Sequence, residues 1–160
     1  MSSDESFEST EEGTLFAPGC AGDIKKNHYM LMKANDYPCK IVSVSHCKTG
    51  KHGSAKCSIT GIDLFTGKKH EDSLPSSAQV KCPIVTKTEY SLINILEDNF
   101  LSIMDEESGD VREDIQLDSL PYWAEVNEKI IADFEAGHEL LVTVLKSMNR
   151  EVVISHRKTS

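Results

Sequence analysis

The first residues of the chain lack any basic residue and any apolar run. Residues 1–12 contain the acidic residues Asp4, Glu5, Glu8, Glu11 and Glu12, and no lysine or arginine. A secretory signal requires an apolar segment and a transit peptide requires arginines, so neither pattern is present. Over the whole chain 39% of residues are hydrophobic, enough for small cores but not for a membrane span. We expect residues 1–19 to form a disordered acidic tail, and the protein to be cytoplasmic with no membrane partner.

Cysteines are few, odd in number and without a paired spacing. The five cysteines (Cys20, Cys39, Cys47, Cys57 and Cys82) include no CxxC pair. Reduced thiols in a reducing compartment therefore fit better than a disulfide framework. His46, Cys47, His52 and Cys57 are close enough in sequence to suggest zinc. However, adjacent residues of a strand point to opposite faces, which would separate His46 from Cys47, so we expect no metal site.

Signatures of catalysis are also missing. The sequence has no nucleophile-elbow serine, no HExxH pair and no glycine-rich loop between a strand and a helix. A Walker A loop would need glycine at the position of Ser45 and serine or threonine at the position of His52, directly after Lys51. A lysine at an exposed loop tip also lacks the burial that activates a nucleophilic amine. We expect that the chain is not an enzyme.

The sequence does contain a lysine between two glycines, in the segment Lys48-Thr49-Gly50-Lys51-His52-Gly53-Ser54-Ala55-Lys56. The flanking residues, 40–46 and 54–65, are rich in residues typical of strands and predict a hairpin. Glycine has no side chain and tolerates positive φ, so Gly50 and Gly53 predict a tight loop with Lys51 at its tip. Such a loop either presents the Lys51 amine to a partner or inserts this amine into the partner.

Charge is divided unevenly along the chain. Residues 1–24 have six acids and no base, for a net charge of −6. Residues 25–70 have nine lysines against two aspartates, for +7, and residues 71–160 have eighteen acids against eight bases, for −10. The lysines nearest the predicted hairpin (Lys48, Lys51, Lys56, Lys68 and Lys69) predict a surface for RNA phosphates. The acidic remainder would limit indiscriminate binding to nucleic acid.

The first half of the chain is predicted to consist of strands. Five are expected, at residues 28–34, 37–46, 54–65, 68–74 and 79–85. Asn35-Asp36 and Thr66-Gly67 are turn signals between them. Strands so close together leave no room for crossover helices, so an antiparallel barrel or sandwich is predicted.

The second half adds a helix. The charge balance changes near residues 85–88, which predicts a domain joint, and strands follow at 91–96, 100–104, 111–117, 139–145 and 152–156. Val126, Ile130 and Phe134 recur every four residues, and Gly137 is placed to end a helix over 121–136. Three strands, a helix and two strands match the plan of the OB-fold. The predicted fold class is therefore mainly β with one helix.

Five segments of the chain resemble the eukaryotic translation initiation factor 5A family. They are residues 48–56, Thr60-Gly61-Ile62-Asp63-Leu64-Phe65-Thr66-Gly67-Lys68-Lys69, Pro38-Cys39-Lys40-Ile41-Val42, Gly109-Asp110-Val111-Arg112-Glu113-Asp114 and Glu139-Leu140-Leu141-Val142-Thr143-Val144-Leu145. Together they extend over nearly the whole chain after the acidic N-terminus. The resemblance implies an SH3-like barrel over residues 20–85 that carries the lysine loop, followed by an OB-fold domain over residues 86–160.

The resemblance also implies a modification. In this family the loop lysine becomes hypusine, because deoxyhypusine synthase transfers an aminobutyl group from spermidine and deoxyhypusine hydroxylase then hydroxylates it. By motif the acceptor here is Lys51, and no other cofactor is implied. The remaining loop residues (Lys48, Thr49, Gly50, His52, Gly53 and Lys56) would form the modification loop and contact RNA, with Lys68 and Lys69 as a secondary basic patch.

A function in translation is implied as well. The factor would bind the ribosome, through rRNA and ribosomal proteins, near the exit-tRNA site and point Lys51 at the acceptor end of peptidyl-tRNA. It would promote elongation, notably at consecutive prolines, and termination. The alternative is an RNA- or protein-binding adaptor of the same fold with unmodified Lys51. Departures from the family pattern are Ser54, where histidine is common, Cys47, where serine is common, and the helix entry at residues 120–123.

Overall fold

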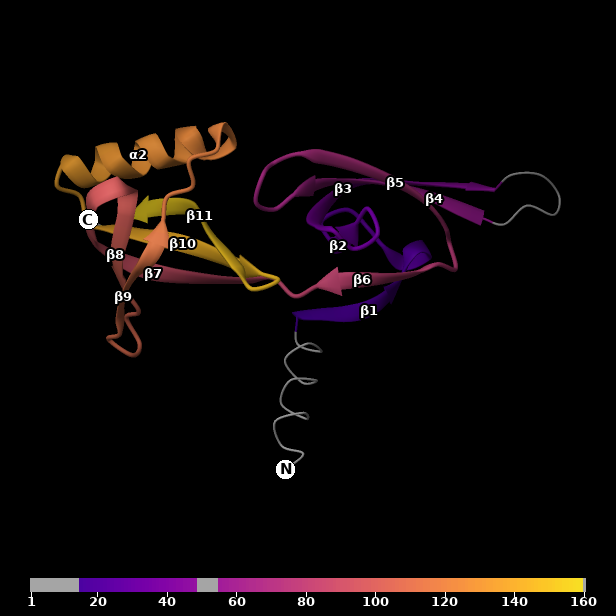
Figure 1. Ribbon diagram of the computed structural model, residues 1–160, viewed down its shortest axis with the longest axis horizontal. Coiled ribbons are helices and arrows are strands. Elements are labelled where there is room, and N and C mark those ends of the chain that lie inside the picture. The colour runs from indigo at the N-terminus through magenta and orange to yellow at the C-terminus, as the bar shows by residue number, and fades with distance from the viewer. Residues whose placement is uncertain (1–14, 49–54, 160) are drawn as a thin grey trace, which may run out of the picture. The chain divides into compact units, whose positions relative to one another are not determined.

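The structure is a computed structural model that describes residues 15–48 and 55–159, with only the backbone of Lys48. The chain divides into two compact units, residues 1–85 and residues 86–160. Both consist mainly of strands, and the longest helix among the described residues belongs to the second unit (Figure 1). Within the described ranges, no helix has the length and apolarity to cross a bilayer.

The first unit consists of two antiparallel sheets. Its elements are β1 (Phe16–Cys20), the 3-10 turn η1 (Ala21–Asp23), β2 (Tyr29–Met32), β3 (Tyr37–Lys48), β4 (Ala55–Asp63), β5 (Lys69–Pro75) and β6 (Gln79–Pro83). The strands β2, β3, β4 and β5 form one sheet in that order, whereas β1 pairs with β6. Because β6 also contacts β2, the two sheets enclose a common core.

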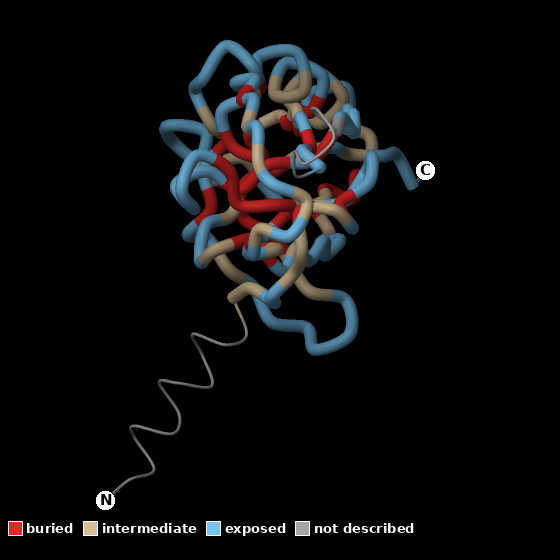
Figure 2. The backbone as a smooth tube through the Cα atoms, turned by 90° about the vertical axis from the view of Figure 1, so that its right-hand side faces the viewer, coloured by how far each residue is buried: buried red, intermediate tan, exposed pale blue. Residues whose placement is uncertain are grey.

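Alternation along the strands places one face of the larger sheet in this core. Cys39 and Ile41 of β3 are fully buried, and so are Cys57 and Ile59 of β4, while the residues between them on each strand are more exposed. Val42 is a bulge in the β3–β4 ladder and is 40% exposed. A bulge increases local twist, which helps a sheet to curl around a core. Figure 2 shows that buried segments alternate with exposed turns along the backbone.

The strand β1 corrects the predicted extent of the acidic tail. The sequence predicts a tail through residue 19, yet Phe16 pairs with Pro83 and Cys20 pairs with Gln79. The Lys81 ammonium lies over the Phe16 ring, 4.6 Å from its centroid. Proline and glycine at positions 18 and 19 make this strand weak by propensity, so it depends on β6, a partner distant in sequence. Residues 1–14 of the predicted tail lie outside the described residues.

The second unit is a five-stranded antiparallel sheet with a helix. Its elements are β7 (Thr86–Ile95), the 3-10 turn η2 (Glu97–Asn99), β8 (Phe100–Met104), β9 (Val111–Gln116), the 3-10 turn η3 (Pro121–Trp123), α2 (Ala124–Glu135), β10 (Leu140–Ser147) and β11 (Arg150–Lys158). The strand order is β11-β10-β7-β8-β9, and the edge strands β9 and β11 contact each other. This closure and order are those of an OB-fold barrel.

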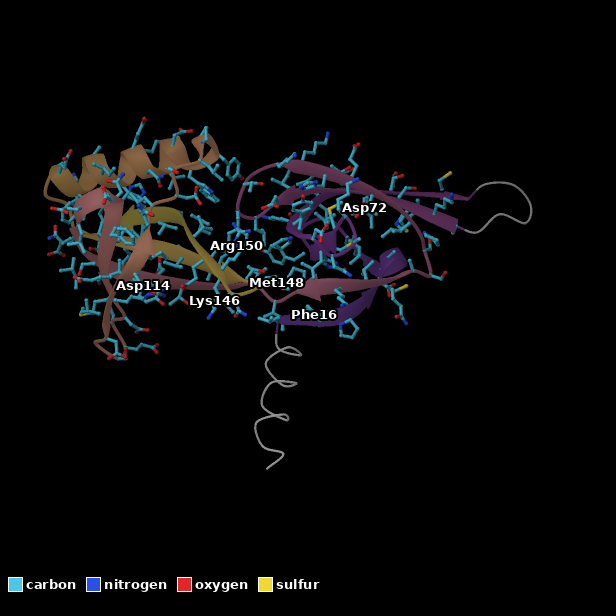
Figure 3. All side chains as sticks on the ribbon, in the orientation of Figure 1. Phe16, Asp72, Asp114, Lys146, Met148 and Arg150 are labelled. Atoms are coloured by element: carbon cyan, nitrogen blue, oxygen red, sulfur yellow. The ribbon has the colours of Figure 1, made fainter. Side chains whose placement is uncertain are left out.

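An arginine joins the two edges of the second sheet. The Arg112 guanidinium on β9 donates two hydrogen bonds to the Glu151 carboxylate on β11, at 2.7 and 2.8 Å. It donates two more to Asp114 (labelled in Figure 3), at 2.7 and 2.9 Å. It also lies 5.9 Å from the Tyr90 ring centroid. The hydrogen bonds from Arg112 lower the pKa of both Glu151 and Asp114. Bidentate arginine–carboxylate pairs are among the stronger polar contacts, so Arg112 stabilises the barrel closure.

The helix α2 confirms the periodicity predicted for it. Ile130 is fully buried, and Val126 and Phe134 pack against the same core cluster as the strands. The helix ends at Glu135, with Ala136 as its C-cap, and Gly137 directly after the cap has a φ of 89°. The Gly137 amide donates to the Phe134 carbonyl and the His138 amide donates to the Asp133 carbonyl, the two bonds of a Schellman motif.

The mainly β fold class with one α-helix is confirmed, and most predicted strands are found within a few residues of their expected bounds. β7 differs, because residues 86–88, expected in the joint, begin a ten-residue strand. They are ordered by pairing with β10, from Thr86↔Lys146 to Thr88↔Val144. A joint predicted from charge balance alone misses this pairing.

Candidate functional site

The candidate site is the hairpin formed by β3 and β4. Its ladder extends from Cys39↔Asp63 to the last pair, Lys48↔Ala55. The predicted loop residues Thr49, Gly50, Lys51, His52 and Gly53 lie outside the described residues, as does the Lys48 side chain. The described part of the hairpin therefore defines where the loop begins and ends, and what holds those two points together.

One face of the hairpin is exposed near the loop. Cys47 and Lys56 pair directly across the two strands, and both are exposed. Lys56 also pairs with Pro75 of β5, so its backbone is held on both sides. The predicted contact residue Lys56 is thus exposed on a fixed strand, one residue before the last pair of the hairpin on the side away from the loop.

On its other side, the hairpin is held by hydrogen bonds of a single residue, Ser76, which directly follows β5. Its amide donates to the Ala55 carbonyl at 2.8 Å. Its own carbonyl accepts hydrogen bonds from the Gly22 amide at 2.9 Å and from the Cys20 thiol at 3.0 Å. We name these residues, with Cys57, the Ser76 junction. It joins the start of β4 to the segment that follows β1.

Side-chain contacts of Cys57 complete the Ser76 junction. The Cys57 sulfur lies 3.3 Å from the Ser76 hydroxyl and 3.4 Å from Nδ1 of His46. His46 is the direct cross-strand neighbour of Cys57, and Cys47 is exposed on the opposite face. The separation predicted for His46 and Cys47 is therefore present. No group of three or more histidine, cysteine or acidic side chains within residues 15–48 and 55–159 has the geometry to hold a metal ion.

The other predicted basic residues do not gather around the loop. Lys68 and Lys69 are both exposed, and Lys69 pairs with Ile62, whereas Lys56 pairs with Pro75. Lys56 and Ile62 are six residue steps apart along β4, a distance of about 20 Å at about 3.3 Å per residue. The secondary patch therefore lies at the opposite end of the sheet, which corrects the expectation of one lysine cluster around the hairpin.

A tight turn fixes that opposite end. The buried Asp63 carboxylate accepts hydrogen bonds from the Phe65 amide at 2.8 Å and the Thr66 amide at 3.0 Å. The Asp63 amide donates to the Lys68 carbonyl at 2.8 Å, so the turn positions Lys68 at the entry to β5. Gly67 within it has a φ of 75°, a conformation that favours glycine.

The buried thiol of β3 is not a reactive group. Burial, together with the nearby carboxylates of Asp63 and Asp72, raises the pKa of Cys39 to about 12. A thiol that stays protonated at neutral pH is a poor nucleophile. Cys39 therefore acts as a core side chain. The described features that can serve a function are the Ser76 junction, which holds the hairpin, and the exposed lysines.

Two family models match the chain, one in each unit. The model "Translation initiation factor 5A-like, N-terminal" matches residues 16–78. The model "Eukaryotic elongation factor 5A hypusine, DNA-binding OB fold" matches residues 84–157. The chain belongs to the translation initiation factor 5A family. It is a translation factor of this family, and the model that matches the second unit is named for hypusine.

Individual relatives agree with this assignment. The chain is 42% identical to eukaryotic translation initiation factor 5A of Drosophila melanogaster, over 95% of this chain and 92% of that protein. It is 41% identical to eukaryotic translation initiation factor 5A-1 of Arabidopsis thaliana, over 92% and 90% of the two chains.

A solved structure of a translation initiation factor 5A family protein from Naegleria fowleri superimposes with a TM-score of 0.81 at 42% identity, covering 89% of this chain and 99% of that one. The factor of Methanococcus jannaschii, at 22% identity and a TM-score of 0.66 over 89% of this chain and 95% of that one, shares the fold.

Sequence reasoning missed the Ser76 junction entirely. Its members are separated along the chain, with Cys20 and Ser76 56 residues apart. The available signal was the Pro75-Ser76 pair, which predicts that a strand ends there. That signal cannot show which amides and thiols the end of β5 will meet.

Proposed function

We propose that Lys51 carries hypusine and that the factor uses it on the ribosome to position peptidyl-tRNA for peptide-bond formation. The observation that carries this proposal is Lys51 itself, between Gly50 and Gly53, in a chain matched by the hypusine family model. Deoxyhypusine synthase and deoxyhypusine hydroxylase would be the modifying enzymes, with spermidine as the aminobutyl donor. The site of action would be cytoplasmic.

Anchoring of the hairpin supports a positioning role. The two arms next to the loop pair at Lys48↔Ala55, and the Ala55 carbonyl is bound by the Ser76 amide. A loop with fixed ends loses less conformational entropy when its tip binds, so more of the contact energy appears as affinity. Hypusine adds length, a hydroxyl and a second amine to Lys51, which would extend its reach toward RNA backbone oxygens.

The gain in rate would come from orientation. The ribosome already holds both reactants, and holding them in the reacting geometry can supply a large part of a rate enhancement. Gains would be greatest where the nascent chain is badly placed, as at consecutive prolines, and the same contact would assist termination. Lys48 and Lys56 would contact phosphates beside the loop, and Thr49 and His52 would contact RNA from within it.

The second unit would contribute by contacting protein. Residues 86–160 contain sixteen acids against seven bases. Such a surface repels phosphates, so RNA contact is expected to fall to the first unit. The rRNA and peptidyl-tRNA contacts would then come from the lysine-bearing sheet, and ribosomal proteins would be the partners of the acidic unit.

Replacement of Lys51 by arginine tests the proposal. Lys51→Arg keeps the charge but removes the acceptor amine, so the purified variant should lack the mass increase of hypusine. Its rate of peptide-bond formation at consecutive prolines in a reconstituted translation reaction should fall on the order of 10- to 100-fold, as expected for lost orientation. Lys56→Arg, which alters a lysine on the same hairpin, should keep both the mass increase and most of the activity.

Two results would contradict the proposal. Full activity of Lys51→Arg would show that a positive charge at the loop tip suffices. An unmodified Lys51 in protein purified from its own cells would favour the adaptor of the same fold, which binds RNA or protein without hypusine.

A further inference from the structure

Tyr37, the first residue of β3, combines exposure with a fixed aromatic neighbour. Its ring is stacked on the imidazole of His70 in β5, with centroids 4.3 Å apart and planes 11° from parallel. His70 is 8% exposed, whereas Tyr37 is 40% exposed. His70 covers one face of the Tyr37 ring, and the pair is accessible to solvent mainly through Tyr37.

The turn before Tyr37 holds this surface in place. The Asp72 carboxylate on β5 (labelled in Figure 3) accepts a hydrogen bond from the Lys33 amide at 2.8 Å. Its other oxygen lies 3.7 Å from the Lys33 ammonium. The turn continues with Ala34 and Asn35, and all three residues have positive φ. Tyr37 then pairs with the fully buried Met32. Both ends of the turn are thus attached to the sheet.

The support beneath Tyr37 is equally fixed. His70 pairs with Gly61 of β4 and is buried, so its backbone is held within the sheet. Nε2 of His70 has no hydrogen-bond partner within the described residues. Stacking and packing, rather than a directional hydrogen bond, therefore keep the imidazole against Tyr37.

One exposed lysine lies close to the pair in sequence. Lys68 ends the turn directly before β5, two residues before His70, and is exposed. Lys69 and Lys40 are exposed on adjacent positions of the sheet, both opposite Ile62, and alternation places them on the other face from His70 and Tyr37. Of the acids at this end, Asp72 binds Lys33 and Asp63 binds the amides of its own turn, whereas Asp36 and Glu71 are exposed.

We propose that Tyr37, backed by His70, is a stacking platform for one unpaired base of an RNA, with Lys68 on an adjacent phosphate. Aromatic rings beside lysines are the usual elements of single-strand recognition, and they accept any base because every base has a flat face. The choice of RNA as the ligand rests on the proposed function. The site is distinct from the lysine loop, which begins at the opposite end of β3.

A fluorescent RNA tests the platform directly. The probe is a single-stranded RNA decamer of adenosines with one 2-aminopurine, mixed at low salt with the unmodified full-length chain. Stacking on Tyr37 should quench 2-aminopurine emission on binding. Tyr37→Ala should weaken binding about 5- to 100-fold and abolish the quenching, as expected for one lost base stack. Tyr37→Phe should retain both.

Control variants separate stacking from charge and from folding. Tyr122→Ala removes a tyrosine that is 52% exposed in the acidic unit, and it should bind the decamer like the unaltered chain. Tyr37→Leu keeps an apolar cover over His70, so it should keep the thermal midpoint and still lose the quenching. Lys68→Ala should weaken binding while the quenching of the bound RNA persists.

The proposal is overturned if Tyr37→Ala or Tyr37→Leu binds and quenches like the unaltered chain, or if only the lysine variants lose affinity. The result is independent of hypusine, because the assay uses unmodified protein. The mass increase at Lys51 and the quenching at Tyr37 are measured separately, so failure of the modified-lysine proposal and failure of the stacking platform give different patterns.

Discussion

Gly61 in β4 faces the core of the first unit at a point where no side chain fits. A β-carbon built on it would lie 2.6 Å from the Met32 sulfur, 2.9 Å from the Cys39 β-carbon and 3.1 Å from a methyl of Ile41. These neighbours are buried, and Cys39 and Ile41 are part of the sheet itself. A glycine here lets three strands curl closely around one core.

Gly61→Ala should therefore destabilise the first unit. Overpacking of a buried site costs about 1–3 kcal/mol, which corresponds to a fall of several degrees in the thermal midpoint of a domain this size. Circular dichroism during heating measures it. Ser58→Ala, at an exposed position of the same strand, is the matched control and should change the midpoint little. Equal midpoints for the two variants would show that the core relaxes around the new methyl.

At the scale of elements, local pattern predicts most of the fold. The period of Val126, Ile130 and Phe134 specifies the helix, and Gly137 ends it as expected. Strands rich in β-branched residues are predicted correctly, apart from errors of a few residues at their ends. β1 is missed because its proline and glycine oppose a strand locally, and only pairing with β6 makes it one.

The candidate site likewise has one part that the local sequence predicts and another that it does not. The loop around Lys51 can be read from spacing, because glycines and lysines within nine residues carry the signal. The Ser76 junction and the Tyr37–His70 stack cannot, because each joins elements that are distant in sequence. Such contacts depend on the register between strands, and composition does not determine register.

The closure of the second barrel by Arg112 predicts a dependence on pH. The hydrogen bonds from Arg112 lower the pKa of Glu151 in the folded state below its value in the unfolded chain. The stabilisation is therefore complete above the unfolded pKa of about 4.3 and is lost as the pH falls through the lower, folded pKa. Glu151→Gln should remove about 1 kcal/mol at pH 7, a value reduced for solvent access to the pair, and much less near pH 3.

Urea unfolding at the two pH values measures this difference. Glu125→Gln is the control, because Glu125 forms an exposed pair with Lys129 one helical turn away. It should change stability by a few tenths of a kcal/mol at either pH. A Glu151→Gln effect that is equal at pH 7 and pH 3 would show that the ionised carboxylate does not stabilise the barrel closure.

At the scale of the whole molecule, each unit has its own core. One cluster of buried residues includes Met30, Ile41 and Val80 of the first unit, and the other is built around Ile130 and Val142 of the second. Each cluster draws all its members from one side of the division at residues 85 and 86. Two separate cores favour two unfolding transitions over one.

The single tryptophan makes this testable in the full-length chain. Trp123 is the only tryptophan in the sequence, and it is buried in the second unit, at 6% exposure. Its fluorescence should follow the second core alone, whereas circular dichroism follows both. Gly61→Ala should therefore shift the dichroism curve and leave the Trp123 curve in place, and Glu151→Gln should shift the Trp123 curve at neutral pH. If Gly61→Ala moved both curves together, the two cores would unfold as one cooperative structure, and the hairpin with Lys51 would depend for its stability on the barrel that Arg112 closes.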